Sequence, residues 1–290
     1  MILVTGASGN VGRAVLYELM NSTAPVRALY RSPSDAAKAP AGVETAIADF
    51  SSTPDLTRAL SGIDEVYLVC SPVPDLVGLE SNVIDACAAN GVKDIVLNSA
   101  LGAGDYPRSF PLWHRTVEEK LKASGIAHTI LRPNSFMQNI LAYYAPTIRT
   151  SGAFYGSYGN AKISYLDVRD IARSVAKALL HPLAHAGQVY ELNGPEAVSC
   201  TELAERISSI TRRPTQYIDI PESAQRKSMA EMGMPGWQID ALIDLQHYYT
   251  NGQGGEVTDV LPTLLERPPV TLNQFLEEFK DQFQTQAASA

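Results

Sequence analysis

The chain has 290 residues, of which 45% are hydrophobic and 19% charged, and it carries a net charge of -8. This length and composition are those of a globular protein with a large core, and the negative charge argues against a nucleic-acid surface. No apolar run reaches the roughly 18 residues of a membrane span, and the first apolar stretch lacks the basic flank of a signal peptide, so we expect a cytoplasmic protein without nucleic-acid or membrane partners.

The first predicted element is a strand over residues 1–5, which runs into glycines at positions 6, 9 and 12. From Asn10 onward apolar residues recur at helical spacing, so we expect a helix whose first turn Asn10 caps. Strand, glycine turn and helix start are the parts of a dinucleotide-binding loop, because glycines admit a pyrophosphate close to the backbone. The spacing is G-x-x-G-x-x-G and not the commoner G-x-G-x-x-G, and a chance glycine cluster is the competing interpretation.

Strands and helices alternate through the first half of the chain. Strands joined by helical crossovers predict an α/β fold with a doubly wound parallel sheet, and ligands of such sheets bind at the carboxyl ends of the strands. Strands are expected at residues 25–30, 43–48, 65–70, 93–98 and 127–132, and helices at 54–61, 75–90 and 111–124, the last two ending at Gly91 and Gly125.

After residue 133 the alternation loosens. We expect a glycine- and aromatic-rich loop at 151–162, a helix at 167–180 capped by Asp167 or Asp170, a strand within 187–195 and a frayed tail at 284–290.

These elements predict a Rossmann sheet with a smaller C-terminal α+β substrate lobe. We expect residues 1–132 to form an NAD(P)-binding domain on which elements near 161–194 pack. Residues 133–160 and 195–290 are expected to form the smaller substrate-binding lobe.

Arg31, followed by Ser32, ends the second predicted strand. At this place an Asp or Glu binds the ribose 2′-hydroxyl of NAD, whereas an arginine accommodates the 2′-phosphate of NADP. The sequence therefore favours NADP(H) over NAD(H), and the competing interpretation is a solvated surface arginine.

The three cysteines are Cys70, Cys87 and Cys200. They are widely separated and odd in number, so we expect neither a disulfide framework nor a metal site. Cys87 shares an apolar helical stripe with Leu76 and Val83 and is expected in the core.

Motifs along nearly the whole chain resemble those of the NmrA-like, atypical short-chain dehydrogenase/reductase family. Within that family the chain is similar to the branch of NADPH-dependent quinone oxidoreductases and triphenylmethane-dye reductases. The motifs are VTGASGNVG, RALYRS, IADFSS, LNSALGAG, HRTVEEKLKASGIAHTILRPNSFMQN, DVRDIA, YELNGPEAVSCTELAERIS and PVTLNQFLEEF.

The resemblance implies contacts between the carboxyl edge of the sheet and successive parts of the cofactor. For the pyrophosphate these are Gly6, Ser8, Gly9, Asn10, Val11 and Gly12, and for the adenosine phosphate Arg31 and Ser32. Asp49 and Phe50 would meet the adenine, and Cys70, Ser71 and Pro72 would lie under the ribose. Ser99, Ala100, Leu101 and His114 would approach the nicotinamide ribose, and Pro133, Asn134, Ser135 and Phe136 the nicotinamide.

The Tyr-x-x-x-Lys catalytic pair of the wider superfamily is missing. If Glu118 is placed at the glutamate that follows the lysine by four residues, His114 stands at the lysine position and Phe110 at the tyrosine position. A ketone would need a positioned acid, whereas a quinone-like or other conjugated electrophile gives a stable reduced product. The expected activity is therefore NADPH-dependent hydride transfer to a small-molecule conjugated acceptor.

His114 is the candidate catalytic residue, with three roles open. It could contact ribose or substrate, relay a proton, or be a helix histidine paired with Glu118. Flat aromatic side chains suit a flat acceptor, whereas Tyr143, Tyr144, Tyr248 and Tyr249 are expected to be packing residues. The candidate substrate-contacting residues are Trp113, Phe136, Met137, Tyr155 and Tyr158.

A second class of function stays open. Some NmrA-like proteins bind the dinucleotide without turnover and regulate a partner, so a redox sensor would share the glycine loop and the arginine. Isomerase or epimerase chemistry is less favoured because it also uses the missing tyrosine. The sequence leaves open whether the chain is a monomer or a homodimer.

Overall fold

The computed structural model describes residues 1–284. All but the first residue of the predicted frayed tail therefore lies outside the described residues. The chain forms two compact units. Unit 1 comprises Met1–Pro133 and Val168–Leu192, and unit 2 comprises Asn134–Asp167 and the chain from Asn193 onward.

Unit 1 is built on a seven-stranded sheet with the order β3-β2-β1-β4-β5-β6-β9. Every neighbouring pair is parallel, which confirms the expected doubly wound α/β sheet. The order reverses between β1 and β4, and ligands of such sheets bind at this switch point. The strands are β1 (Ile2–Val4), β2 (Val26–Tyr30), β3 (Glu44–Ile47), β4 (Glu65–Leu68), β5 (Asp94–Asn98), β6 (Ala127–Pro133) and β9 (Val189–Leu192).

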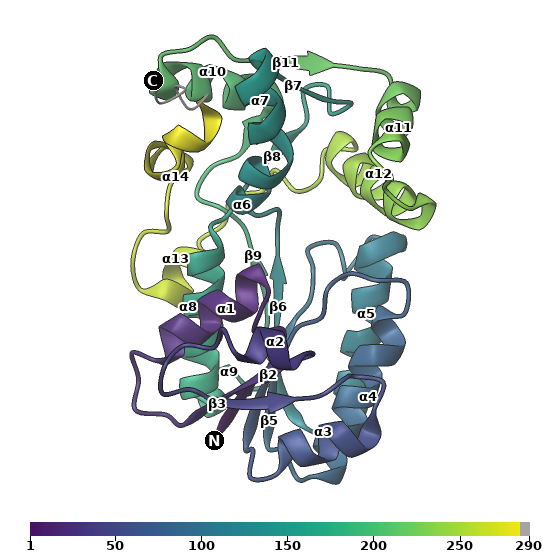
Figure 1. Cartoon of the computed structure of the whole chain (residues 1–290), viewed down its shortest axis with the longest axis vertical. Coiled ribbons are helices and arrows are strands. Elements are labelled where there is room, and N and C mark those ends of the chain that lie inside the picture. Colours follow the sequence, from purple (N-terminus) through teal and green to yellow (C-terminus); the bar gives the residue numbers. More distant parts are fainter. Residues whose placement is uncertain (285–290) are drawn as a thin grey trace. The chain divides into compact units, whose positions relative to one another are not determined.

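Helices cover both faces of this sheet (Figure 1). α1 and α8 pack together on one face, and α3, α4 and α5 lie on the other, where they enclose the main apolar core with Leu3, Val66 and Leu97. The helices of unit 1 are α1 (Asn10–Leu19), α2 (Pro33–Ala36), α3 (Thr53–Leu60), α4 (Leu76–Ala89), α5 (Ser109–Ala123), α8 (Val168–Leu180) and α9 (Pro182–His185).

The C-terminal ends of α4 and α5 follow the sequence, whereas the start of α1 does not. Gly91 and Gly125 lie just after α4 and α5 with φ of 73° and 76°, as expected of C-terminal glycines. The expected Asn10 cap is wrong, because the cap position of α1 is Gly9 and Asn10 is already helical. Cys87 is fully buried in the core, as predicted.

Unit 2 has two small sheets surrounded by helices. β7 (Ala153–Gly156) pairs in parallel with β11 (Gln216–Asp219), and β8 (Lys162–Ile163) pairs antiparallel with β10 (Val198–Ser199). The predicted loop at 151–162 is therefore wrong over β7, whose pairing partner lies far away in the sequence. The helices are α6 (Met137–Asn139), the π-helical turn η1 (Ile140–Tyr144), α7 (Ala145–Ser151), α10 (Cys200–Thr211), α11 (Glu222–Glu231), α12 (Gly236–Thr250), α13 (Val260–Leu265), α14 (Leu272–Glu278) and the 3-10 turn η2 (Lys280–Phe283).

Candidate functional site

The turn between β1 and α1 is packed too tightly for side chains. Gly6 has a φ of 57°, and a Cβ there would lie 2.7 Å from Cγ1 of Val69. A Cβ on Gly12 would lie 2.6 Å from the carbonyl carbon of Gly6, and the Gly9 amide donates to the Gly6 carbonyl at 2.9 Å. Residues 8–10 are exposed at the start of α1, where the first amides of a helix have no intrahelical acceptor. This geometry suits a pyrophosphate.

Thr5 joins the ends of β1 and β4 beside this turn. Its Oγ1 accepts from the Val69 amide at 2.9 Å and donates to the Val69 carbonyl at 3.1 Å. The next residue, Cys70, is half-buried, and burial raises the pKa of its thiol to about 12, so the thiol is neutral. Ser71 and Pro72 follow on the exposed surface. The predicted ribose-contacting segment thus starts from a fixed strand end.

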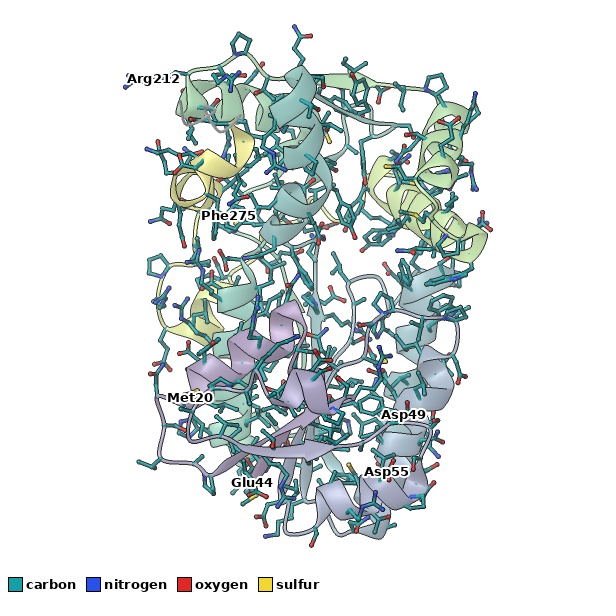
Figure 2. All side chains as sticks on the ribbon, viewed as in Figure 1. Met20, Glu44, Asp49, Asp55, Arg212 and Phe275 are labelled. Carbon is teal, nitrogen blue, oxygen red and sulfur yellow. The ribbon has the colours of Figure 1, made fainter. Side chains whose placement is uncertain are left out.

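Arg31 is exposed at the end of β2 and forms no ion pair within residues 1–284. Its neighbour Ser32 caps α2, accepting from the Asp35 amide at 3.2 Å. Asp49 lies past the end of β3 (Figure 2). Hydrogen bonds from Ser51 lower the pKa of Asp49, and the positive charge of Arg31 lowers it further. An unpaired cation is therefore available where the adenosine end of a dinucleotide is expected.

Phe50 follows Asp49 and packs, half-buried, against the core. Its carbonyl accepts from the side-chain amide of Asn82 at 3.1 Å. This bond joins the end of β3 to α4 and fixes the backbone of the segment that is expected to meet the adenine.

Glu118 on α5 anchors the ends of β5 and β6. Its Oε1 accepts from Ser99 Oγ at 2.6 Å, and its two oxygens accept from Arg132 at 2.9 and 2.7 Å. Burial raises the pKa of Glu118, but the donors Arg132 and Ser99 outweigh it, so the net shift is downward and the carboxylate is ionised. Backbone bonds from Ser99 to Leu131 and from Leu101 to Pro133 continue this junction.

His114 is 8% exposed and lies one turn before Glu118 on α5. Its Nδ1 has no hydrogen-bond partner among the described residues, and Glu118 is engaged by Arg132 and Ser99 instead. Burial lowers the pKa of His114 to about 4, with Glu118 opposing the shift, so the imidazole is neutral at pH 7. The pairing of His114 with Glu118 expected as one alternative is therefore not made as a hydrogen bond.

Phe110 and Trp113 lie on the first turns of the same helix. Their rings meet edge to face with centroids 5.3 Å apart. The position expected for a catalytic tyrosine is thus a packed apolar ring, and Trp113 is half-buried against the core of unit 1.

Asn134, the first residue of unit 2, is buried and fully hydrogen-bonded. Its Nδ2 is 2.9 Å from each of three acceptors, which are Ser164 Oγ, Asn193 Oδ1 and the Gly254 carbonyl. Its Oδ1 accepts from the Ser135 amide at 2.7 Å and from the hydroxyl of Tyr249 at 3.1 Å. We call these residues the Asn134 hub. The side chain of Asn134 makes all its hydrogen bonds within unit 2, so only the backbone of Asn134 would be available for the expected contact with the nicotinamide.

The residues after the hub form a short parallel bridge. Ser135 and Leu166 are joined by a 3.0 Å backbone bond, and the Met137 amide donates to the Leu166 carbonyl at 2.9 Å. Phe136 is half-buried, whereas Met137 is fully buried at the start of α6. Met137, expected to contact substrate, therefore has no exposed surface here.

Unit 2 contains a pocket of about 730 Å³. Tyr158, predicted as a substrate contact, lines it, whereas Tyr155 does not and is 45% exposed. Tyr249, expected only to pack, is also a wall of the pocket, and no local sequence pattern distinguishes it from its buried neighbour Tyr248. The lining residues are Tyr158, Gly159, Asn160, Ala161, Lys162, Tyr249, Thr250, Gly252, Gly255 and Glu256.

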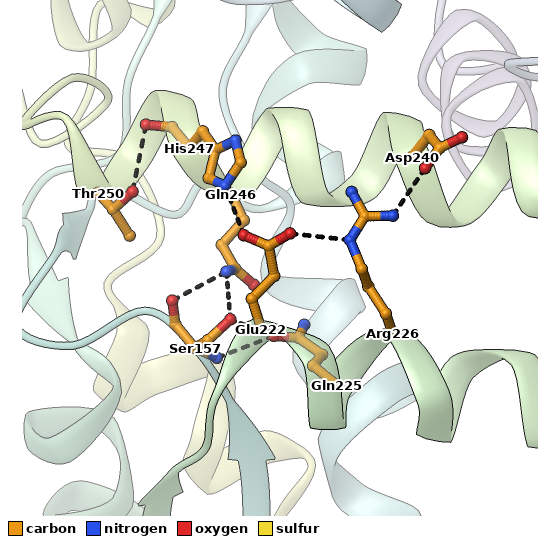
Figure 3. Close-up of polar contacts among 8 residues, drawn as sticks. All are labelled: Ser157, Glu222, Gln225, Arg226, Asp240, Gln246, His247 and Thr250. Atoms are coloured by element: carbon orange, nitrogen blue, oxygen red, sulfur yellow. Dashed lines mark hydrogen bonds and ion pairs between the residues drawn. The ribbon is translucent and has the colours of Figure 1, made fainter.

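The start of the pocket loop is fixed by α11 and α12 through Ser157 (Figure 3). The amide and hydroxyl of Ser157 donate to Gln225 Oε1 at 2.9 and 2.6 Å, and Gln246 Nε2 donates to the Ser157 carbonyl at 2.8 Å. The two helices are joined to each other by Glu222, which pairs with His247 at 2.8 Å. Sequence reasoning missed this network because its members lie far apart in the chain.

Within residues 1–284, no group of three or more His, Cys, Asp or Glu side chains is placed to hold a metal ion. No helix in this part of the chain is long and apolar enough to cross a membrane.

Comparisons with known proteins agree with this geometry. The NAD(P)H-binding family model matches residues 6–182. The chain is 36% identical to the NAD(P)H azoreductase of Xenophilus azovorans, over 95% of this chain and 96% of that protein. It is 31% identical to the NADPH-dependent quinone oxidoreductase of Escherichia coli solved with NADPH, with a TM-score of 0.88 over 96% of this chain and 99% of that one.

A third comparison concerns the fold alone. The Citrobacter sp. triphenylmethane reductase solved with NADP(H) gives a TM-score of 0.86 at 21% identity, over 96% of this chain and 99% of that one. The resemblance stated from the sequence motifs is confirmed by these findings.

Proposed function

This chain belongs to the NAD(P)H-binding family, and from that premise we propose that it is an NADPH-dependent oxidoreductase that transfers hydride to a quinone-like or other conjugated electrophile. The coarser role of NAD(P)H-dependent oxidoreductase follows from its reductase relatives. In this proposal unit 1 binds the dinucleotide and unit 2 supplies the acceptor site.

The glycine turn between β1 and α1 is the observation that carries the proposal. Gly12 leaves no room for a Cβ, and the first amides of α1 lie where a pyrophosphate would bind. Arg31 is unpaired at the end of β2, where a 2′-phosphate would provide the missing anion. These residues fit NADPH better than NADH.

NADPH supplies the hydride when bound. The chain contributes orientation: the ionised Glu118 holds Ser99, and the end of β5 is bonded to the end of β6, where the nicotinamide side is expected. Phe110 has no proton to give, and the buried His114 is neutral. A conjugated acceptor suits such a site, because its reduced product is stable without a positioned acid.

The test is oxidation of NADPH by the purified protein with a panel of quinones and conjugated dyes, followed by nicotinamide absorbance, with NADH alongside. We expect protein-dependent loss with at least one acceptor, faster with NADPH than with NADH. Tight NADPH binding with no acceptor reduced above background would replace this proposal with the redox-sensor function.

A further inference from the structure

Glu80 lies in the second turn of α4 and is completely buried. It shares the buried side of this helix with Leu76, Ile84 and Cys87, which belong to the main apolar core. Neither of its two carboxyl oxygens has a hydrogen-bond partner among the described residues. A buried polar group without a partner lowers stability, so packing alone does not account for a glutamate at this position.

The end of β4 lies beside this carboxyl group. β4 ends at Leu68 and α4 begins at Leu76, so a short connection brings the first turns of the helix next to the strand end that precedes them. Burial raises the pKa of the Glu80 carboxyl group well above its usual value, and the backbone amide of Cys70 opposes that shift. Burial is also the main cause of the raised pKa of the Cys70 thiol, and Glu80 is the next. The amide and the thiol of Cys70 are therefore both close to Glu80.

α4 supports a second strand end of the expected cofactor site. Asn82 Nδ2 donates to the Phe50 carbonyl at 3.1 Å, just past the end of β3. Val69, the residue before Cys70, is held by hydrogen bonds to Thr5 Oγ1. The backbone that leaves β4 is thus fixed by Thr5 at Val69, and at the next residue it meets the buried carboxyl group of α4.

We propose that Glu80 is a positioning residue for the dinucleotide, and that its carboxyl group is the acceptor that holds the Cys70 amide. The segment that it places, Cys70–Pro72, is the one expected under the cofactor ribose. This inference rests on the dinucleotide binding of the proposed function and is independent of the acceptor. A polar group that costs stability and places a binding segment is the compromise between stability and activity expected at a functional site.

The experiment titrates Glu80→Leu and Glu80→Gln with NADPH and with NADH, followed by nicotinamide fluorescence, and measures their urea unfolding. In Glu80→Leu both affinities should fall by the same factor of about five, the worth of one hydrogen bond, because the ribose is common to both cofactors. Its urea midpoint should equal or exceed that of wild type, because a buried polar group without a partner is removed. Glu80→Gln keeps a carbonyl acceptor, so both affinities should stay within about twofold of wild type.

Asp85→Asn is the matched control, because Asp85 is an exposed acid on the same helix, and it should bind both cofactors like wild type. Wild-type binding in Glu80→Leu would overturn the inference. Equal losses in Glu80→Leu and Glu80→Gln would overturn it as well, since the acceptor would then not be what matters. A urea midpoint of Glu80→Leu below that of wild type would indicate a purely structural role and have the same consequence. Where Glu80→Leu does not fold, Glu80→Met repeats the test, and failure of both variants to fold also overturns the inference.

The wild-type titration separates this inference from the proposed function. A wild type that binds NADPH but reduces no acceptor loses the reductase function, and the affinities of the Glu80 variants still decide the inference. A wild type that binds neither cofactor overturns both.

Discussion

Arg132 contacts both carboxylate oxygens of Glu118, with Nε 2.9 Å from Oε1 and Nη2 2.7 Å from Oε2. Glu118 is 1% exposed, and Ser99 uses the same Oε1. One buried carboxylate therefore joins α5, β5 and β6 at the carboxyl edge of the sheet. A bidentate pair of this kind fixes orientation as well as distance.

Glu118→Gln should destabilise the protein by about 3 kcal/mol, because Arg132 loses its buried anionic partner. The folded pKa of Glu118 is lowered, so its contribution is present above about pH 4.3, the unfolded value, and is lost as pH falls through the folded pKa. Urea unfolding at pH 7 and pH 3 measures both effects. The exposed neighbour Glu119→Gln is the control, and equal midpoints for the two variants at pH 7 would contradict the expectation.

His114 should make stability fall between pH 6.5 and pH 4. In this window the unfolded chain binds a proton on the imidazole and the folded protein does not, since burial lowers the folded pKa to about 4. Across this window the pKa difference of this one group lowers the free energy of unfolding by about 3 kcal/mol in total. Urea unfolding across this range should show a shallower pH dependence in His114→Gln, whereas the exposed His181→Gln should follow wild type. Parallel curves for wild type and His114→Gln would refute it.

Arg31→Asp should weaken NADPH binding at least about tenfold while changing NADH binding little, because only NADPH carries the 2′-phosphate. Fluorescence titration with both cofactors measures the ratio. Arg27→Met is the contrasting variant. Arg27 pairs with Glu44 at 2.8 Å and donates to the Ala59 carbonyl at 2.7 Å. The Arg27→Met variant should therefore be less stable than wild type but keep the same ratio of NADPH to NADH affinity. Equal losses of both cofactors in Arg31→Asp would remove the phosphate role.

Gly12→Ala should cost about 2 kcal/mol of stability and weaken dinucleotide binding, because the new methyl group would push α1 away from the turn at Gly6. Gly236→Ala is the control. Gly236 begins α12 in open space, with nothing within 4 Å of an added Cβ. Thermal unfolding and NADPH titration of the two variants provide the comparison, and a Gly12→Ala protein that binds NADPH like wild type would speak against the loop assignment.

The fold of unit 1 could be predicted because its signals are local. Most of its strands are short, largely apolar runs, and Gly91 and Gly125 mark helix ends by a backbone conformation that glycine adopts readily. β7 was missed because it exists through pairing with β11, and no residue near 153 announces a partner near 216. Nonlocal pairing of this kind leaves no periodic signal.

The residues of the candidate site also divide into those with a local sequence signal and those without one. The glycine turn and Arg31 stand at positions that chain order specifies, so their placement follows from the motif. Tyr249 and Gln246 act through residues distant in sequence, and nothing around them indicates a pocket. Glu80 did carry a signal, because it occupies the apolar stripe of α4, where burial raises the pKa of its carboxyl group well above the usual value.

The segment 134–167 interrupts unit 1 and delays its completion during synthesis. A nascent chain that has just passed Pro133 contains six of the seven strands, but α8, the helix that packs against α1, has not been made. The apolar face of α1, which includes Val15 and Leu19, stays without α8 until the whole of 134–167 has been synthesised. β9, which joins the open edge of β6, comes later still. Residues 1–133 alone therefore do not make up the whole of unit 1. A fragment ending at Pro133 would expose the side of the sheet that α8 covers.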